Sequence, residues 1–250
     1  MRAAILSLIL LTGLLAGPPA RAEETPPPAC DVPGSLLNSD STLAKVAAAV
    51  KSGKPLNVLV VGSRSSTIAA QEASAYPARL LTMLKEKLGP VPVNLSVEIQ
   101  SGKTAEEVAA TLVKLVEAKN PTLVIWQTGT YDAIRGIDPD DFRSAVDEGV
   151  TALQKAGVDV VLVNLQYSPR TETMTSAPPY LDNMRVVAQQ HDIPLFDRFA
   201  IMRHWNDSGD FDLFSATHGV ELAKSVHACL GRALTTFVID AAHLEQAQQN

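Results

Sequence analysis

Residues 57–67, NVLVVGSRSST, are the stretch that decides how the rest of the chain is interpreted. Their first half, with four consecutive apolar residues at 58–61, is typical of a strand buried on both faces. The apolar run ends at Gly62, and four hydroxyl residues follow, namely Ser63, Ser65, Ser66 and Thr67. In an open α/β sheet the ligand site lies beyond the carboxyl ends of the strands, so we expect these hydroxyls at a functional site.

Strand and helix patterns alternate along the rest of the chain. Further strands are predicted at 93–99, 123–126, 158–165 and 193–196, and helices at 41–51, 78–88, 104–119, 140–156, 179–191, 199–205 and 218–242. Ser41 and Thr42 are expected to cap the first helix, Thr104 and Glu107 form a capping-box pattern, and residues 166–175 are predicted to be a loop. Five alternations without a repeat predict a single three-layer α/β/α domain with a mostly parallel sheet of about five strands.

The N-terminus has the pattern of a cleavable signal peptide at residues 1–22. Arg2 precedes an apolar run that is short for a membrane span, and Ala20-Arg21-Ala22 is a small-x-small site with cleavage expected after Ala22. We therefore predict a periplasmic or secreted protein with an extended lead-in at 23–40, the α/β domain at 41–242 and a polar tail at 243–250. No later stretch predicts a membrane span.

The charge balance excludes some classes of partner. Removal of Arg2 and Arg21 leaves 19 basic residues against 27 acidic ones, a net charge near −8 over about 228 residues. Nucleic acids and anionic membrane surfaces both require clustered Lys and Arg, so we predict neither as a partner.

The chain has two cysteines, Cys30 and Cys229. In an oxidising compartment two distant cysteines are expected to form one disulfide, here between the N-terminal lead-in and the last helix. Closing so long a loop is expected to stabilise the fold by roughly 4–5 kcal/mol in the chain-entropy model.

With the strands placed, the sequence resembles the SGNH hydrolases, also called GDSL-type esterases and lipases, over nearly all of the chain after residue 22. That family has a Gly-Asp-Ser or Gly-Ser-Ser-Ser-Thr block after its first strand, a glycine after the second, Gly-x-Asn-Asp after the third and Asp-x-x-His at the final helix. Here the corresponding strand ends carry Ser65, Gly102 and residues 129–132, and the strings at 75–80, 126–129 and 202–205 are similar to an exported branch of the family. The resemblance implies an SGNH/flavodoxin-like fold and hydrolysis of esters.

The first block is one residue longer than the family pattern. It reads Gly62-Ser63-Arg64-Ser65-Ser66-Thr67. Counting back from Thr67 places the family's nucleophile on Ser65. Counting forward from Gly62 places it on Arg64, which cannot attack an ester. We predict Ser65 as the nucleophile, with Ser63 and Ser66 as alternatives; the hydroxyls also fit a simpler role as caps of nearby N–H groups.

The resemblance implies two donors for the oxyanion that develops in acyl transfer. Such donors are each worth ~3–4 kcal/mol. The backbone N–H of Gly102 matches the second-block glycine, and Tyr131 stands where the family has its Asn, next to Asp132. Tyr131 fits equally well as a wall of the cleft, and Asp132 fits a helix cap.

The last block departs most from the family. An alignment on Ser215 and Cys229 places residues 218–221, HGVE, over Asp-Gly-Leu-His, so both the acid and the base are replaced. Glu221 stands at the position of the base, but an unshifted carboxylate is a poor base for a serine hydroxyl. His218 lies one turn earlier, so we predict a His218–Glu221 pair with His218 as the base.

These residues predict a serine hydrolase that acts on an ester, either acetylated cell-envelope carbohydrate or a small ester. The alternative is a catalytically inactive member of the family that binds an envelope ligand or a partner protein, because three of the four signature positions differ. Asp132, Asp210, Asp212 and His218 match no metal-ligand spacing, and we predict no metal and no other cofactor. Of the remaining histidines, His191, His227 and His243 are expected to be structural. His204 precedes a polar loop from which it could approach the site, but beside Trp205 it is expected to pack.

Overall fold

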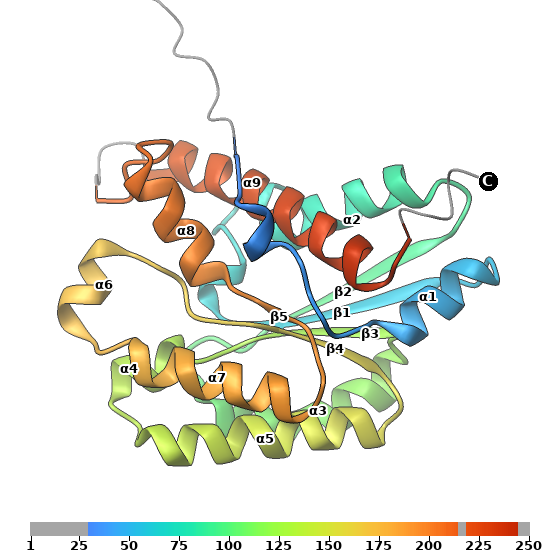
Figure 1. Ribbon diagram of the computed structural model, residues 1–250, viewed down its shortest axis with the longest axis horizontal. Helices are drawn as coiled ribbons and strands as arrows, with labels where there is room; N and C mark the ends of the chain where they lie inside the picture. The colour runs from blue at the N-terminus through green and yellow to red at the C-terminus, as the bar shows by residue number, and fades with distance from the viewer. Residues whose placement is uncertain (1–29, 215–218, 245–250) are drawn as a thin grey trace, which may run out of the picture.

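The computed structural model describes residues 30–214 and 219–244 and contains a five-stranded sheet in the order β2-β1-β3-β4-β5 (Figure 1). Every pair of neighbouring strands is parallel. The strands are β1 (Leu56–Gly62), β2 (Val93–Ile99), β3 (Leu123–Gln127), β4 (Asp159–Val163) and β5 (Leu195–Phe196). The predicted parallel α/β sheet is confirmed, and its order is the flavodoxin-like one.

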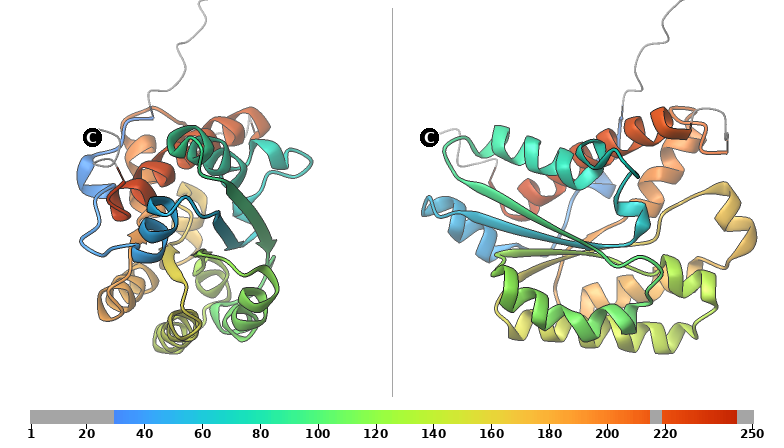
Figure 2. Two further views of the ribbon diagram at one scale, coloured as in Figure 1. Left: turned by 90° about the vertical axis from the view of Figure 1, so that its right-hand side faces the viewer. Right: turned by 180° about the vertical axis from the view of Figure 1, so that it is seen from behind.

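Helices cover both faces of the sheet. Figures 1 and 2 show α2, α8 and α9 on one face and α3, α5 and α7 on the other. The α-helices are α1 (Ala44–Lys51), α2 (Tyr76–Leu88), α3 (Ala105–Lys119), α4 (Thr130–Arg135), α5 (Pro139–Lys155), α6 (Pro169–Met174), α7 (Pro178–Gln190), α8 (Arg198–Asp207) and α9 (Gly219–Ala241). Three 3-10 helices complete the set, η1 (Gly34–Leu36), η2 (Arg64–Ser66) and η3 (Glu72–Ser74). Among the described helices, none has the length and apolarity that a membrane crossing requires.

Strand β1 lies inside the sheet and is buried on both faces. Val58 to Val61 are at most 3% exposed, as the apolar run in the sequence predicts. In the register, Gly62 is opposite Ile99, and Val61 is opposite Trp126. Gln127 is opposite Val163, which in turn is opposite Phe196. The carboxyl ends of the five strands are therefore level, and the loops that follow them meet at one edge of the sheet.

The two predicted helix caps have different outcomes. At α3 the Thr104 hydroxyl accepts the N–H of Glu107, and the Glu107 carboxylate accepts the N–H of Thr104, so the capping box is confirmed. At α1 the predicted cap at Ser41 and Thr42 is wrong, because the helix begins at Ala44. Its free N–H groups at Lys45 and Val46 are bonded instead by Asp159 Oδ2, at 2.8 and 2.9 Å, from the start of β4.

Two short helices lie where the sequence predicts loops. Helix α4 follows β3 directly, and α6 lies within the predicted loop 166–175. Each has six residues, which is too short for a 3.6-residue periodicity to be recognised. In the lead-in, η1 forms one 3-10 turn where an extended chain is expected.

The predicted disulfide between Cys30 and Cys229 is present, with 199 residues of sequence separation. It joins the N-terminal segment to α9, and all five strands lie between the two cysteines in the chain. The Trp205 Nε1–H also donates to the carbonyl of Asp31 at 2.8 Å. The predicted signal peptide at 1–22 and most of the predicted tail lie outside the described residues.

Candidate functional site

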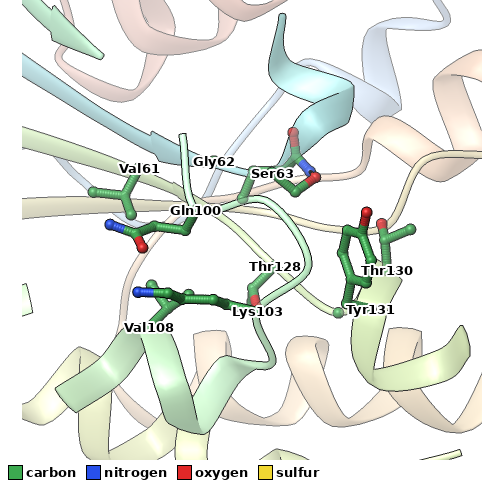
Figure 3. Close-up of a pocket in the computed structure, with 11 residues that line it drawn as sticks. Val61, Gly62, Ser63, Gln100, Lys103, Val108, Thr128, Thr130 and Tyr131 are labelled. Carbon is green, nitrogen blue, oxygen red and sulfur yellow. Dashed lines mark hydrogen bonds between the residues drawn. The ribbon is translucent and has the colours of Figure 1, made fainter. Parts of the chain in front are cut away.

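A small pocket lies at the carboxyl ends of β1 and β3 (Figure 3). The residues that line it are Val61, Gly62, Ser63, Gln100, Lys103, Val108, Gln127, Thr128, Gly129, Thr130 and Tyr131. In Figure 3, Gln100 and Lys103 lie on one side and Thr130 and Tyr131 on the opposite side. The chain leaves β1 toward β2 on one flank, whereas β3 lies on the other, so the pocket is at the switch point where α/β folds bind ligands.

The hydroxyl loop after β1 turns back on the end of the strand as η2. Ser66 packs against Gly62 so closely that any Cβ at position 62 would clash with its hydroxyl group. Ser63 precedes η2, and its hydroxyl accepts the N–H of Ser65 at 3.4 Å. The loop therefore depends on a residue without a side chain at the last position of β1.

The three serines of this loop differ in accessibility. Ser66 is fully buried, Ser63 is 8% exposed, and Ser65 is partly exposed. The Ser63 and Ser65 hydroxyl oxygens are 3.1 Å apart and share a hydrogen bond. Of the three residues, Ser65 is the most exposed, whereas Ser63 is the one that lines the pocket.

Gln127, the last residue of β3, connects all three serines. Its Nε2 donates to Ser63 Oγ at 2.9 Å and to Ser65 Oγ at 3.1 Å, which uses both amide hydrogens. Its Oε1 accepts a hydrogen bond from the Ser66 hydroxyl and lies 3.4 Å from the hydroxyl of Tyr76. Neither Gln127 nor Tyr76 was predicted as a site residue from the sequence.

Arg198, at the start of α8, reaches the same cluster from the end of β5. Its side chain is 1% exposed, and its Nη1 donates to Ser65 Oγ at 3.1 Å and to Gln127 Oε1 at 2.8 Å. Its Nη2 donates to the carbonyl of Ser65 at 3.1 Å and to Gln166 Oε1 at 3.2 Å. Arg198 was not predicted as a site residue, although its position two residues after β5 places it at the functional edge of the sheet.

The two predicted oxyanion residues lie beside each other. A Cβ built on Gly102 would be 3.9 Å from Tyr131 Cε1, and Gly102 has a φ of +75° that favours glycine. The turn at Gly102 is held by Arg135, whose Nη2 donates to the Gly102 carbonyl at 2.6 Å. Tyr131 lines the pocket directly.

Asp132 is 1% exposed and is not among the residues that line the pocket. Its Oδ1 accepts the N–H of Ala105, the first residue of α3, at 2.8 Å, whereas Oδ2 has no partner. Burial raises the pKa of this carboxyl group, against the opposing effect of the backbone N–H of Ala105. These contacts fit the capping role for Asp132 better than a contact with a ligand.

The predicted acid–base pair is not assembled by the described residues. Glu221 is highly exposed and pairs with Lys224 at 2.8 Å, and it makes no hydrogen bond with Ser65. His218 lies outside the described residues. His227 is buried and its Nδ1 accepts the N–H of Tyr76 at 2.9 Å. Burial, reinforced by Arg198, lowers the pKa of His227 to about 3, so this imidazole is neutral and structural.

Within residues 30–214 and 219–244, no three His, Cys, Asp or Glu side chains converge in a way that would hold a metal ion.

The model of the non-GDSL lipase-like family matches residues 29–244, which is most of the chain. The chain belongs to this family. The predicted relationship to GDSL-type hydrolases is thereby confirmed. A comparison with curated proteins found no match.

Solved structures similar to this member of the non-GDSL lipase-like family include several esterases. A two-domain esterase active on acetylated mannans aligns with a TM-score of 0.66 and 15% identity, over 83% of this chain and 55% of that one. An acetyl-xylooligosaccharide esterase from Geobacillus aligns with a TM-score of 0.59 and 15% identity, over 81% and 96% of the two chains. TesA aligns with a TM-score of 0.55 and 20% identity, over 72% and 99%. At these identities the comparison establishes the shared fold.

Proposed function

We propose that this protein is a serine ester hydrolase with Ser65 as its nucleophile. The observation that carries the proposal is the position of Ser65, a partly exposed residue after the carboxyl end of β1 whose hydroxyl accepts hydrogen bonds from Arg198 and Gln127. Donors and a cation beside a hydroxyl oxygen favour its ionised form, which is the nucleophilic one.

In the proposed reaction the Ser65 oxygen attacks the ester carbonyl carbon while its proton passes to a base. The carbonyl oxygen becomes an oxyanion, for which the backbone N–H of Gly102 and the Tyr131 hydroxyl are the proposed donors. The bond between the carbonyl carbon and the alcohol oxygen then breaks, and the alcohol leaves with the proton. Water hydrolyses the acyl–Ser65 ester by the same steps. We assign the base to His218, because Glu221 is directed to Lys224.

We propose as substrate a short-chain ester, either on acetylated cell-envelope carbohydrate or on a small molecule. The small pocket beside Ser63 and the hydroxyl and amide groups that line it support this choice, since such groups bind sugars and small acyl groups. The esterases with similar folds, which act on acetylated mannan and xylooligosaccharide, are consistent with it. The Cys30–Cys229 disulfide supports action outside the cytoplasm, as the sequence of residues 1–22 predicts.

A second candidate is a catalytically inactive binding protein. It is favoured by one observation: among the described residues no His, Asp or Glu side chain hydrogen-bonds to Ser65, whose oxygen is instead surrounded by donors. An unassisted serine hydroxyl is a weak nucleophile.

Turnover of p-nitrophenyl acetate and release of acetate from acetylated xylo- and manno-oligosaccharides separate the two candidates. The hydrolase predicts activity that falls to the buffer background in Ser65→Ala and is unchanged in Ser144→Ala, a control at an exposed position of α5. The hydrolase proposal fails if the wild type shows no turnover on any of these esters. Binding of the oligosaccharides without turnover would support the second candidate.

A further inference from the structure

Arg198 is a buried cation without a carboxylate partner in the part of the chain that the structure describes. It is 1% exposed and forms none of the ion pairs found there. The adjacent acid, Asp197, accepts instead from Asn164 at 2.7 Å, from the N–H of Ala200 at 3.0 Å and from Arg185 at 3.1 Å. Burying a charge without a counter-ion is costly, so its retention calls for a role other than stability.

The hydrogen bonds of Arg198 converge on Ser65. Arg198 Nη1 donates to the Ser65 hydroxyl and Nη2 donates to the Ser65 carbonyl. The side chain therefore holds both the proposed nucleophile and the backbone of η2 in place. The remaining bonds go to the side-chain oxygens of Gln127 and Gln166. The bond to Gln127 Oε1 fixes the orientation of that amide, which leaves its Nε2 directed at Ser63 and Ser65.

The groups packed around the guanidinium do not cancel its charge. Its Cζ lies 5.8 Å from the centroid of the Tyr76 ring, on α2, and burial raises the pKa of that phenol. His227, on α9, is neutral because burial lowers its pKa to about 3. Burial also lowers the pKa of Arg198 to about 10, which still leaves the guanidinium charged at neutral pH.

We propose that Arg198 is the positioning residue of the nucleophile: it holds Ser65 at the end of β1 and favours the ionised form of its hydroxyl by donating a charged hydrogen bond to it. This inference rests on the proposed hydrolase function. Arg198 takes no proton in the step. The proton of Ser65 leaves to the base, and the electron pair that remains on Oγ, stabilised by the guanidinium, forms the bond to the carbonyl carbon.

The test is the rate at which a fluorophosphonate labels Ser65, measured as a function of pH in the full chain. With the guanidinium charge centred about 4 Å from the hydroxyl oxygen and an effective dielectric constant of about 20, Arg198 lowers the pH at which Ser65 ionises by roughly three pH units. About half of the resulting gain in labelling rate is offset, because a less basic oxygen is a weaker nucleophile, as is known for thiolates. Labelling of Arg198→Met at pH 7 is therefore expected to be about 30-fold slower than that of the wild type.

The pH profile separates this role from a purely structural one. The wild-type rate is expected to rise with pH and to level off at a lower pH than the Arg198→Met rate, because the guanidinium lowers the pH at which the Ser65 hydroxyl ionises. Arg198→Lys keeps the charge but loses the two-nitrogen guanidinium contact, so its labelling rate is expected to lie between those of the wild type and Arg198→Met. If Arg198→Met does not fold, Arg198→Lys takes its place in the test. Arg203→Met is the matched control, since Arg203 lies on the same helix with an exposed side chain.

The outcomes distinguish this inference from the proposed function. If the wild type is labelled and the folded Arg198 variants are labelled at the same rate with the same pH profile, Arg198 has no such role and the hydrolase proposal stands. If the wild type is not labelled at all, the hydrolase proposal fails and this inference fails with it.

Discussion

Opening the disulfide should remove a large part of the stability of this fold. The substitution Cys30→Ser breaks the bond at its partly exposed end and leaves the buried Cys229 side chain in place, so no cavity is created. The bond closes a loop with a sequence separation of 199 residues that contains the whole sheet. In the chain-entropy model this constraint on the unfolded chain is worth about 5 kcal/mol, and for a protein of this size that lowers Tm by about 10–20 °C.

Guanidinium unfolding followed by circular dichroism measures the difference in the free energy of unfolding. Dithiothreitol should destabilise the wild type by a similar amount and leave Cys30→Ser unchanged, which separates the loss of the cross-link from other effects of the substitution. A loss below about 1 kcal/mol would refute the argument that the cross-link acts on the unfolded chain.

Three further predictions concern the stability of the fold. Asp159→Ala should cost about 1 kcal/mol in urea unfolding, because the first N–H groups of α1 lose their acceptor; an unchanged midpoint would contradict this role. Burial raises the folded-state pKa of Asp132, so the stability linked to its protonation is full below the unfolded value of about 3.9 and is lost as pH rises through the raised folded value. Asp132→Asn should therefore gain stability relative to the wild type between pH 3 and pH 7 in urea titrations, and a constant difference would be evidence against the raised pKa. Gly129→Ala should cost about 1–3 kcal/mol in thermal unfolding, since φ is +93° there and a Cβ would press on Leu165; a neutral effect would show that the turn can relax.

Local sequence signals predicted local structure well. The capping box at Thr104 and Glu107 spans four residues, and both of its hydrogen bonds form as the pattern requires. The buried run at 58–61 likewise predicted an interior strand. The cap of α1 was beyond such signals, because Asp159 is more than a hundred residues from the N–H groups that it accepts. Only the packing of α1 against the start of β4 brings them together.

The candidate site was predicted only in part, because only some of its residues lie next to a recognisable local pattern. Ser63, Ser65, Gly102 and Tyr131 each follow a recognisable strand, and the structure gathers them at one edge of the sheet. Arg198 was missed because it falls between the predicted strand at 193–196 and the predicted helix at 199–205, where no local pattern indicates a contact. A long side chain after that strand can nevertheless reach Ser65 across the level strand ends.

Gln127 was not identified, because a strand predicted from its run of apolar residues gives no role to a polar residue at its end. It is the last residue of β3 and is 3% exposed, so composition alone gives it no functional meaning. Its amide has two hydrogens and one oxygen, and the fold supplies partners for all of them. A buried polar residue with several hydrogen-bond partners can be identified once the neighbouring strand ends are placed, since its side chain must find partners there.

The most direct test of the central claim identifies the residue that carries a fluorophosphonate adduct. Trypsin cleaves after Arg64 and so separates Ser63 from a peptide that begins at Ser65, and fragmentation of that peptide distinguishes Ser65 from Ser66. The account predicts one adduct on Ser65 in the wild type and none in Ser65→Ala. An adduct on Ser63 or Ser66, or an unlabelled wild type, would contradict it.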